Sequence, residues 1–141
     1  MADSELAAEL GHELYFDTRL SGNGSVSCAS CHKPELMFTD GLPLAVGTDI
    51  GTRHTPSLVG ISYSPWFYWD GRKDSQWSQA LAPLESIHEH NTDRLRVTRT
   101  VAEDDRYREL YESIFGSIPT IPLEPFSATP LGNESQQTAW I

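Results

Sequence analysis

The chain has 141 residues, which suits one domain or one domain with a connecting tail. Its net charge of −10 argues against nucleic-acid binding, because phosphate recognition needs clustered lysine and arginine. The sequence has no apolar run long enough to span a membrane, and residues 1–20 are acidic where a secretory leader would be basic and then apolar.

The first predicted helix begins after Ser4, whose hydroxyl can cap it, and ends near residues 15–16. One face of this helix is apolar, and carries Leu6, Leu10 and Leu14. A loop over residues 21–24 then leads to a cysteine motif. After that motif, residues 33–65 are rich in Gly, Pro, Ser and Thr and predict a long irregular segment.

Three more helices are predicted in the second half of the chain. Asp74 caps the first of them, which ends at Pro83, and Thr92 caps the second. Asp104 caps the third, and Gly116 ends it. Its apolar residues follow the spacing i, i+3, i+4, i+7, i+8, at Tyr107, Leu110, Tyr111, Ile114 and Phe115.

The chain is therefore expected to be mainly α-helical with much coil, since strand-like alternation is nearly absent. Residues 1–116 form the predicted domain. Residues 117–141 form a predicted extended tail, because prolines recur along them.

The sequence Cys28-Ala29-Ser30-Cys31-His32 is a Cys-x-x-Cys-His motif. Two thiols three residues apart on a helical turn can each add to a haem vinyl group, and the adjacent histidine can then ligate the iron. The two cysteines are the only ones in the chain, so the motif predicts one covalent haem c. Two alternatives remain at this point. One is a thiol redox pair, and the other is a zinc site completed by His88 and His90.

Methionine, the usual second axial ligand of an electron-carrying cytochrome, is scarce in this chain. Only Met1 and Met37 occur, and Met37 follows His32 too closely to reach the opposite face of a porphyrin. Met37 is therefore predicted to pack in the haem pocket. A weakly ligated iron favours chemistry over simple electron carriage.

Several motifs carry a family resemblance in the same order along the chain. They are residues 14–21, the haem motif, Phe38-Thr39-Asp40-Gly41, residues 53–58, Phe67-Tyr68-Trp69-Asp70-Gly71-Arg72, and residues 79–85. Together they resemble the bacterial di-haem cytochrome c peroxidases and the related di-haem enzyme that matures methylamine dehydrogenase. The resemblance covers residues 10–116 of this chain, and within the family it corresponds to the N-terminal, peroxide-reacting domain. The second haem domain of that family has no counterpart in this chain.

The resemblance implies a cytochrome c-like fold and a role for each matching residue. His32 would be the proximal ligand, and Trp69 would pass electrons between two haems. Glu89 would be the distal acid–base group, Gln79 the distal amide, and Pro83 a residue lining the same pocket. Arg53 and Arg72 could pair with haem propionates, or form ordinary surface salt bridges.

This chain departs from the resemblance at two positions. Thr48 stands where some members have a distal histidine. His54 stands where the family usually has an asparagine that helps bind calcium, and imidazole is a poor ligand for that hard cation. Calcium is therefore not predicted. His12, His88 and His90 are expected to be exposed.

The implied function is reduction of hydrogen peroxide to water at the His32 haem, or oxidation of a protein substrate at the same site. The implied partners are an electron-donating cytochrome or cupredoxin and the second haem domain. Because haem c is attached outside the bacterial cytoplasm, a periplasmic protein is expected. The alternative is a mono-haem electron-transfer or haem-binding module without turnover.

Overall fold

The computed structural model describes residues 4–120, so most of the predicted tail lies outside the described residues. Its main helices are α1 (Glu5–Phe16), α3 (Gln76–Glu85), α4 (Arg94–Glu103) and α5 (Asp105–Phe115), with a short α2 (Cys28–Cys31). Three isolated β-bridges are the only strand pairing within the described part of the chain. The mainly helical prediction is confirmed. Between residues 4 and 120, the helices are too short or too polar to cross a membrane.

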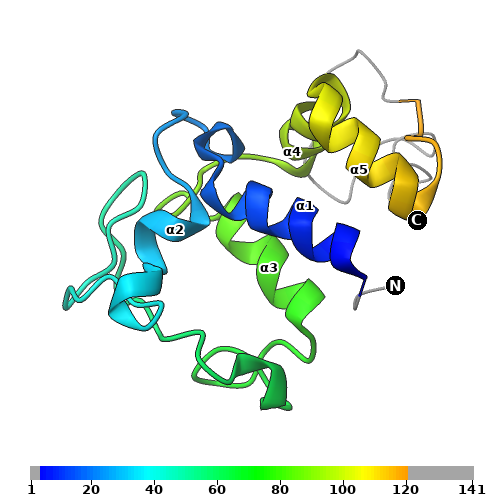
Figure 1. The fold of residues 1–141 in the computed structure, drawn as a ribbon. Coiled ribbons are helices and arrows are strands. Elements are labelled where there is room, and N and C mark those ends of the chain that lie inside the picture. The colour runs from blue at the N-terminus through cyan, green and yellow to red at the C-terminus, as the bar shows by residue number, and fades with distance from the viewer. Residues whose placement is uncertain (1–3, 121–141) are drawn as a thin grey trace.

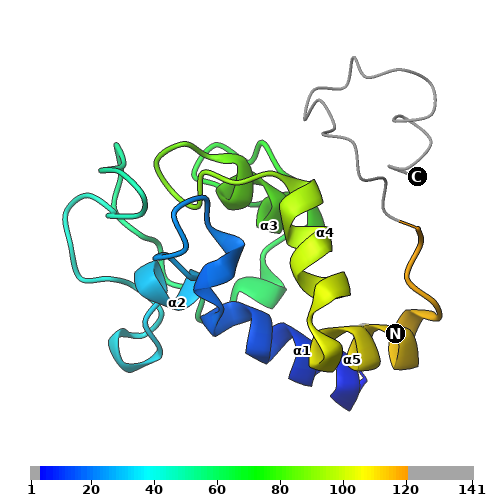
Figure 2. The same cartoon turned by 90° about the horizontal axis from the view of Figure 1, so that it is seen from above.

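The apolar core lies where α1 packs against α5 (Figure 1). Leu10, Tyr107 and Leu110 are buried at its centre. Partly buried residues of α1, α4 and α5 surround them: Leu14, Val101, Tyr111 and Ile114. Figures 1 and 2 show α4 and α5 at one end of the molecule, with α2 and the irregular segment at the other.

Helix starts agree with the sequence at α1 and α5. Ser4 Oγ accepts a hydrogen bond from Ala7 N–H, and Asp104 accepts from the N–H groups of Arg106 and Tyr107. The last of these helices ends at Gly116, as predicted, where the backbone φ angle is +86°.

Two other predicted helix starts are each wrong by one residue, and one predicted end is wrong by two. Ser75, not Asp74, caps α3 by accepting from Ser78 N–H. Asp93, not Thr92, caps α4. Pro83 lies inside α3, which continues to Glu85, and Ser86 N–H donates to Ala82 O at the end of the helix. The proline therefore removes the hydrogen bond from its own nitrogen without ending the helix there.

The predicted irregular segment contains two three-residue 3₁₀ turns, at Pro34–Leu36 and Ile61–Tyr63, and two of the isolated β-bridges. It forms an arc that leads from α2 towards α3 (Figure 1). Three non-glycine residues around it have left-handed backbone conformations, namely Met37, Phe38 and Tyr68. These conformations are uncommon for side-chain-bearing residues, and they direct the backbone at sharp bends.

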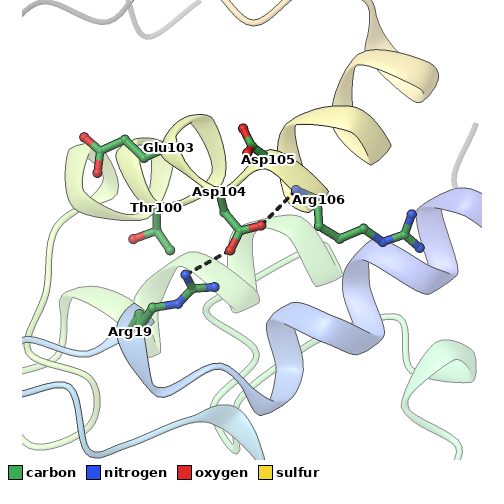
Figure 3. A pocket seen from close by; sticks show the side chains of 6 residues that line it. All are labelled: Arg19, Thr100, Glu103, Asp104, Asp105 and Arg106. Carbon is green, nitrogen blue, oxygen red and sulfur yellow. Dashed lines mark hydrogen bonds and ion pairs between the residues drawn. The ribbon is translucent and has the colours of Figure 1, made fainter.

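An ion-pair network fixes the junction of α4 and α5 to the turn after α1. Arg19 pairs with Asp104 at 2.9 Å (Figure 3). Arg19 also pairs with Asp17 at 2.6 Å, and Tyr107 Oη donates to Asp17 at 2.9 Å. A cavity of about 540 Å³ opens beside it, lined by Arg19, Thr100, Glu103, Asp104, Asp105 and Arg106. Of the two aspartates that line the cavity, Asp104 caps α5 and pairs with Arg19, and Asp105 pairs with Arg108. Both carboxylates therefore already have partners, and the cavity is a consequence of how α4 and α5 meet.

The network predicts a loss of stability in acid. Burial raises the pKa of Asp17, but the hydrogen bonds from Arg19 and Tyr107 outweigh burial and hold the pKa below its usual 3.8. A carboxylate with a lowered folded-state pKa stabilises the fold above its unfolded pKa, and this contribution is lost as the pH falls through the folded value. Asp17→Asn should therefore lower the free energy of unfolding by about 1 kcal/mol at neutral pH.

The difference between wild type and Asp17→Asn should shrink below about pH 4, as the wild-type carboxylate takes up its proton. Urea unfolding of both proteins at several pH values measures this difference. Asp105→Asn is the control, because Asp105 is 90% exposed and its substitution should have little effect. A difference that persisted unchanged in acid would contradict the charge-based explanation.

Candidate haem-binding site

The cysteine motif forms a single helical turn. Ser27 precedes it, and the Ser27 N–H donates to Ser30 Oγ at 3.0 Å, which closes the turn at its start. His32 ends the turn, and its N–H donates to Cys28 O at 2.9 Å. Both cysteines are free and half-buried. The turn and the residue that caps it therefore present two thiols and an imidazole at positions 28, 31 and 32.

Burial raises the pKa of both thiols. For Cys31, the negative charges of Asp40 and Glu89 raise the pKa further. A thiol–disulfide catalyst needs the opposite shift, because its attacking species is the thiolate. The raised pKa of both thiols therefore argues against a redox-active Cys-x-x-Cys pair.

The ring of His32 is oriented by the backbone that follows it. Its Nδ1 lies 3.0 Å from Phe38 O, and a carbonyl can only accept, so Nδ1 carries the proton. The lone pair of Nε2 is then left for a metal, which is the usual arrangement of a ligating histidine. Left-handed φ angles at Met37 (56°) and Phe38 (60°) shape the turn that carries this carbonyl. Tyr15 Oη donates to His32 O. These residues fit an axially ligated haem.

The predicted distal residues come from α3 and from the loop over residues 86–91. Gln79 and Pro83 are four residues apart in α3 and so share one face of the helix. The carbonyl oxygen of the Gln79 side chain is buried and has no hydrogen-bond partner among the described residues. Such an oxygen is suited to accept a hydrogen bond from a bound ligand.

Tyr68 also lies near the predicted distal residues Gln79 and Glu89, although no role for it was predicted from the sequence. Burial raises the pKa of its phenol, the charge of Glu89 raises it further, and Arg72 and Gln79 partly offset both effects. Gln79 and Glu89 therefore both lie close enough to Tyr68 to affect its phenol. The only signal in the sequence is the position of Tyr68 beside Trp69.

The remaining predicted residues lie at the surface. Trp69 is 72% exposed, and the Arg53 guanidinium lies 4.6 Å from the centre of its ring. Arg72 pairs with Asp70 at 2.7 Å and stacks on Tyr68. Met37 is 66% exposed. The roles of these residues towards a haem stay predictions.

The prediction that His90 is exposed is wrong. His90 is only 4% exposed, its Nδ1 lies 3.0 Å from Leu20 O, and its Nε2 lies 4.0 Å from Cys28 Sγ. The backbone contact joins residues 70 positions apart, which no local sequence pattern shows. By contrast, His12 is exposed, as predicted, and His88 is half-buried beside Asp49.

Comparison with known proteins places this chain in a family. The family described as di-haem cytochrome c peroxidase matches residues 5–135. The methylamine utilization protein MauG of Methylorubrum extorquens is 36% identical over 140 residues, covering 93% of this chain and 40% of that protein. The cytochrome c551 peroxidase of Nitrosomonas europaea is 34% identical over 112 residues, covering 78% of this chain and 34% of that protein.

A solved structure of a MauG-like protein associated with microbial copper homeostasis superposes with a TM-score of 0.75 at 28% identity. The match covers 84% of this chain and 36% of the solved one. The chain thus spans 40% or less of the length of these three relatives. Since the family match extends over nearly the whole sequence, the chain belongs to the di-haem cytochrome c peroxidase family, whose cofactor is haem c.

Proposed function

We propose that residues 1–116 form the peroxide-reacting haem unit of a periplasmic peroxidase, with one haem c attached to Cys28 and Cys31 and ligated by His32. The observation that carries this proposal is the orientation of the His32 ring, whose Nδ1 donates to Phe38 O and whose Nε2 makes no hydrogen bond with residues 4–120. The haem, when bound, supplies the iron that accepts hydrogen peroxide and provides electrons for its reduction.

The chain's own residues supply the proton chemistry. Hydrogen peroxide, two electrons and two protons give two molecules of water. The Glu89 carboxylate takes a proton from one peroxide oxygen and returns it to the other, so that the leaving oxygen departs as water rather than hydroxide. The unpaired carbonyl oxygen of Gln79 accepts a hydrogen bond from peroxide and orients it. Pro83, one turn further along α3, lines the same pocket.

Trp69 is proposed to relay the electrons. Its 72% exposure leaves the indole available to a partner, in this case the second haem domain of the family. A small cytochrome or a cupredoxin would be the external electron donor. Oxidation of a protein substrate is the second candidate function, and the 36% identity to the methylamine utilization protein favours it.

One haem per chain is the first expected result. After denaturation, the intact mass should exceed that of the polypeptide by the mass of one haem, because Cys28 and Cys31 are the only thiols. The double substitution Cys28→Ala/Cys31→Ala should carry no covalent haem. A wild-type protein without this added mass would contradict the proposal.

The peroxide reaction is tested by stopped-flow mixing of the ferric, haem-loaded chain with hydrogen peroxide. We expect a Soret change whose rate rises with peroxide concentration. Steady turnover of this 141-residue polypeptide with a reduced cytochrome should be slow, since its single Cys-x-x-Cys-His motif provides one haem, whereas the proposed relay through Trp69 joins two. Absence of any peroxide-dependent spectral change would contradict the proposed function and favour a module that binds haem without turnover.

A further inference from the structure

The loop over residues 86–91, which carries Glu89, is held from two sides. One side is the stretch before the haem motif, around Gly22, and the other is the stretch after it, around Gly47. Both glycines make backbone contacts so close to the loop that no side chain would fit. The loop is therefore held in place by backbone contacts with the two segments that precede and follow Cys28 and Cys31.

On the side that follows the haem motif, around Gly47, three hydrogen bonds hold the loop. Thr48 N–H donates to Glu89 O at 2.8 Å, and Asp49 N–H donates to His88 O at 3.2 Å. The Thr48 hydroxyl donates to Ile87 O at 2.9 Å. A Cβ atom on Gly47 would lie 2.4 Å from His88 O and 2.7 Å from the Cα of Glu89. These atoms are backbone, so a larger residue could enter only by pushing the loop away.

On the other side, Gly22 N–H donates to His90 O at 2.8 Å. A Cβ atom on Gly22 would lie 2.1 Å from Asn91 O. The buried His90 ring adds the bond between its Nδ1 and Leu20 O. Neither backbone approach tolerates a side chain without movement of the loop.

The same contacts reach the haem-attachment turn. Cys31 Sγ lies 3.5 Å from Val46 O, immediately before Gly47, and Cys28 Sγ lies 4.0 Å from His90 Nε2. The loop that bears the carboxylate and the turn that bears the thiols thus share neighbours on both sides. The loop also follows directly from the end of α3, and this connection is independent of the two segments.

We infer that Gly22 and Gly47 are positioning residues for Glu89. Because these two residues have no side chain, the segments on either side of the haem motif can contact the backbone of the 86–91 loop. These contacts fix the position of the Glu89 carboxylate relative to the haem. This inference rests on the proposed role of Glu89 in peroxide cleavage. Neither glycine touches the reacting atoms, and both act through the backbone of the loop.

Gly47→Ala is the main test, in the haem-loaded chain. The loop must shift to admit the new methyl group, and a shift of about 1 Å in a catalytic group can cost on the order of 10²-fold in rate. The second-order rate of the ferric protein with peroxide should therefore fall by roughly 10- to 100-fold. Gly11→Ala is the matched control, because a Cβ there meets no atom within 4 Å and the rate should not change.

Two further measurements separate positioning from a general structural defect. In Gly47→Ala, amide hydrogen exchange should quicken at Thr48 and Asp49, whereas the Gly22 amide on the opposite side of the loop keeps its protection. The double variant Gly47→Ala/Glu89→Gln should react no more slowly than Glu89→Gln alone, since a misplaced carboxylate and a missing one have the same consequence.

Each contrary result has a definite meaning. If Glu89→Gln slows the reaction but Gly47→Ala does not, this inference is wrong and the proposed function stands. Additive losses in the double variant would show that Gly47 does not act through Glu89. If Glu89→Gln has no effect, the role of Glu89 and this inference fail together. Should Gly47→Ala not fold, Thr48→Val replaces it, with an expected loss of about threefold that Thr48→Ser restores; no loss in Thr48→Val would overturn the inference.

Discussion

Glu89→Gln is expected to slow the reaction of the haem-loaded chain with hydrogen peroxide by about 10²- to 10⁴-fold, the usual contribution of a general acid–base group. The amide keeps the shape of the side chain but cannot take up and return a proton. Haem attachment should be unaffected, because the thioether bonds are formed by Cys28 and Cys31, which this substitution leaves unchanged.

Stopped-flow spectroscopy at the Soret band measures the rate, and mass spectrometry confirms equal haem loading in both proteins. Glu103→Gln is the matched control, since Glu103 is an exposed carboxylate at the end of α4 and lines the cavity beside Arg19. Its rate should equal that of the wild type. An unchanged rate in Glu89→Gln would mean that Glu89 is an ordinary loop carboxylate.

The parts of the fold that sequence predicts well are those with local signals. α1 and α5 each have a strong capping residue, Ser4 or Asp104, and although a second one is adjacent in sequence (Asp3 or Asp105), the regular apolar face that follows indicates where the helix begins. At α3 and α4, two good capping residues stand side by side, Asp74 with Ser75 and Thr92 with Asp93. Intrinsic preference does not separate such neighbours, and tertiary contacts decide which one caps the helix.

The candidate site residues likewise differ in whether a local sequence pattern indicates them. Cys28, Cys31 and His32 are adjacent in sequence, so their spacing alone indicates haem attachment. Glu89 and Gln79 were reached only through the family resemblance, because a lone carboxylate and a lone amide carry no local signal. The burial of His90 could not be foreseen, since it depends on a contact with residue 20, 70 positions away. Contacts of this kind arise only once the chain is folded.

Leu110→Ala is expected to have the largest effect on stability. Leu110 is 3% exposed at the centre of the α1–α5 core, and removing a fully packed leucine costs about 2–5 kcal/mol in the free energy of unfolding. Leu6→Ala is the matched control on α1, because Leu6 is 42% exposed and should lose much less. Urea unfolding of the haem-loaded proteins measures both changes.

The same variant also tests whether stability and chemistry are separate in this fold. The residues around Leu110 come from α1, α4 and α5, and none of them is a candidate site residue. The cavity left by Leu110→Ala should therefore leave the peroxide rate of the folded protein unchanged, whereas Glu89→Gln should lower the rate without lowering stability. A Leu110→Ala protein that is folded but reacts slowly with peroxide would contradict this separation. It would mean that the α1–α5 core helps to hold Glu89 in place, in addition to the segments around Gly22 and Gly47.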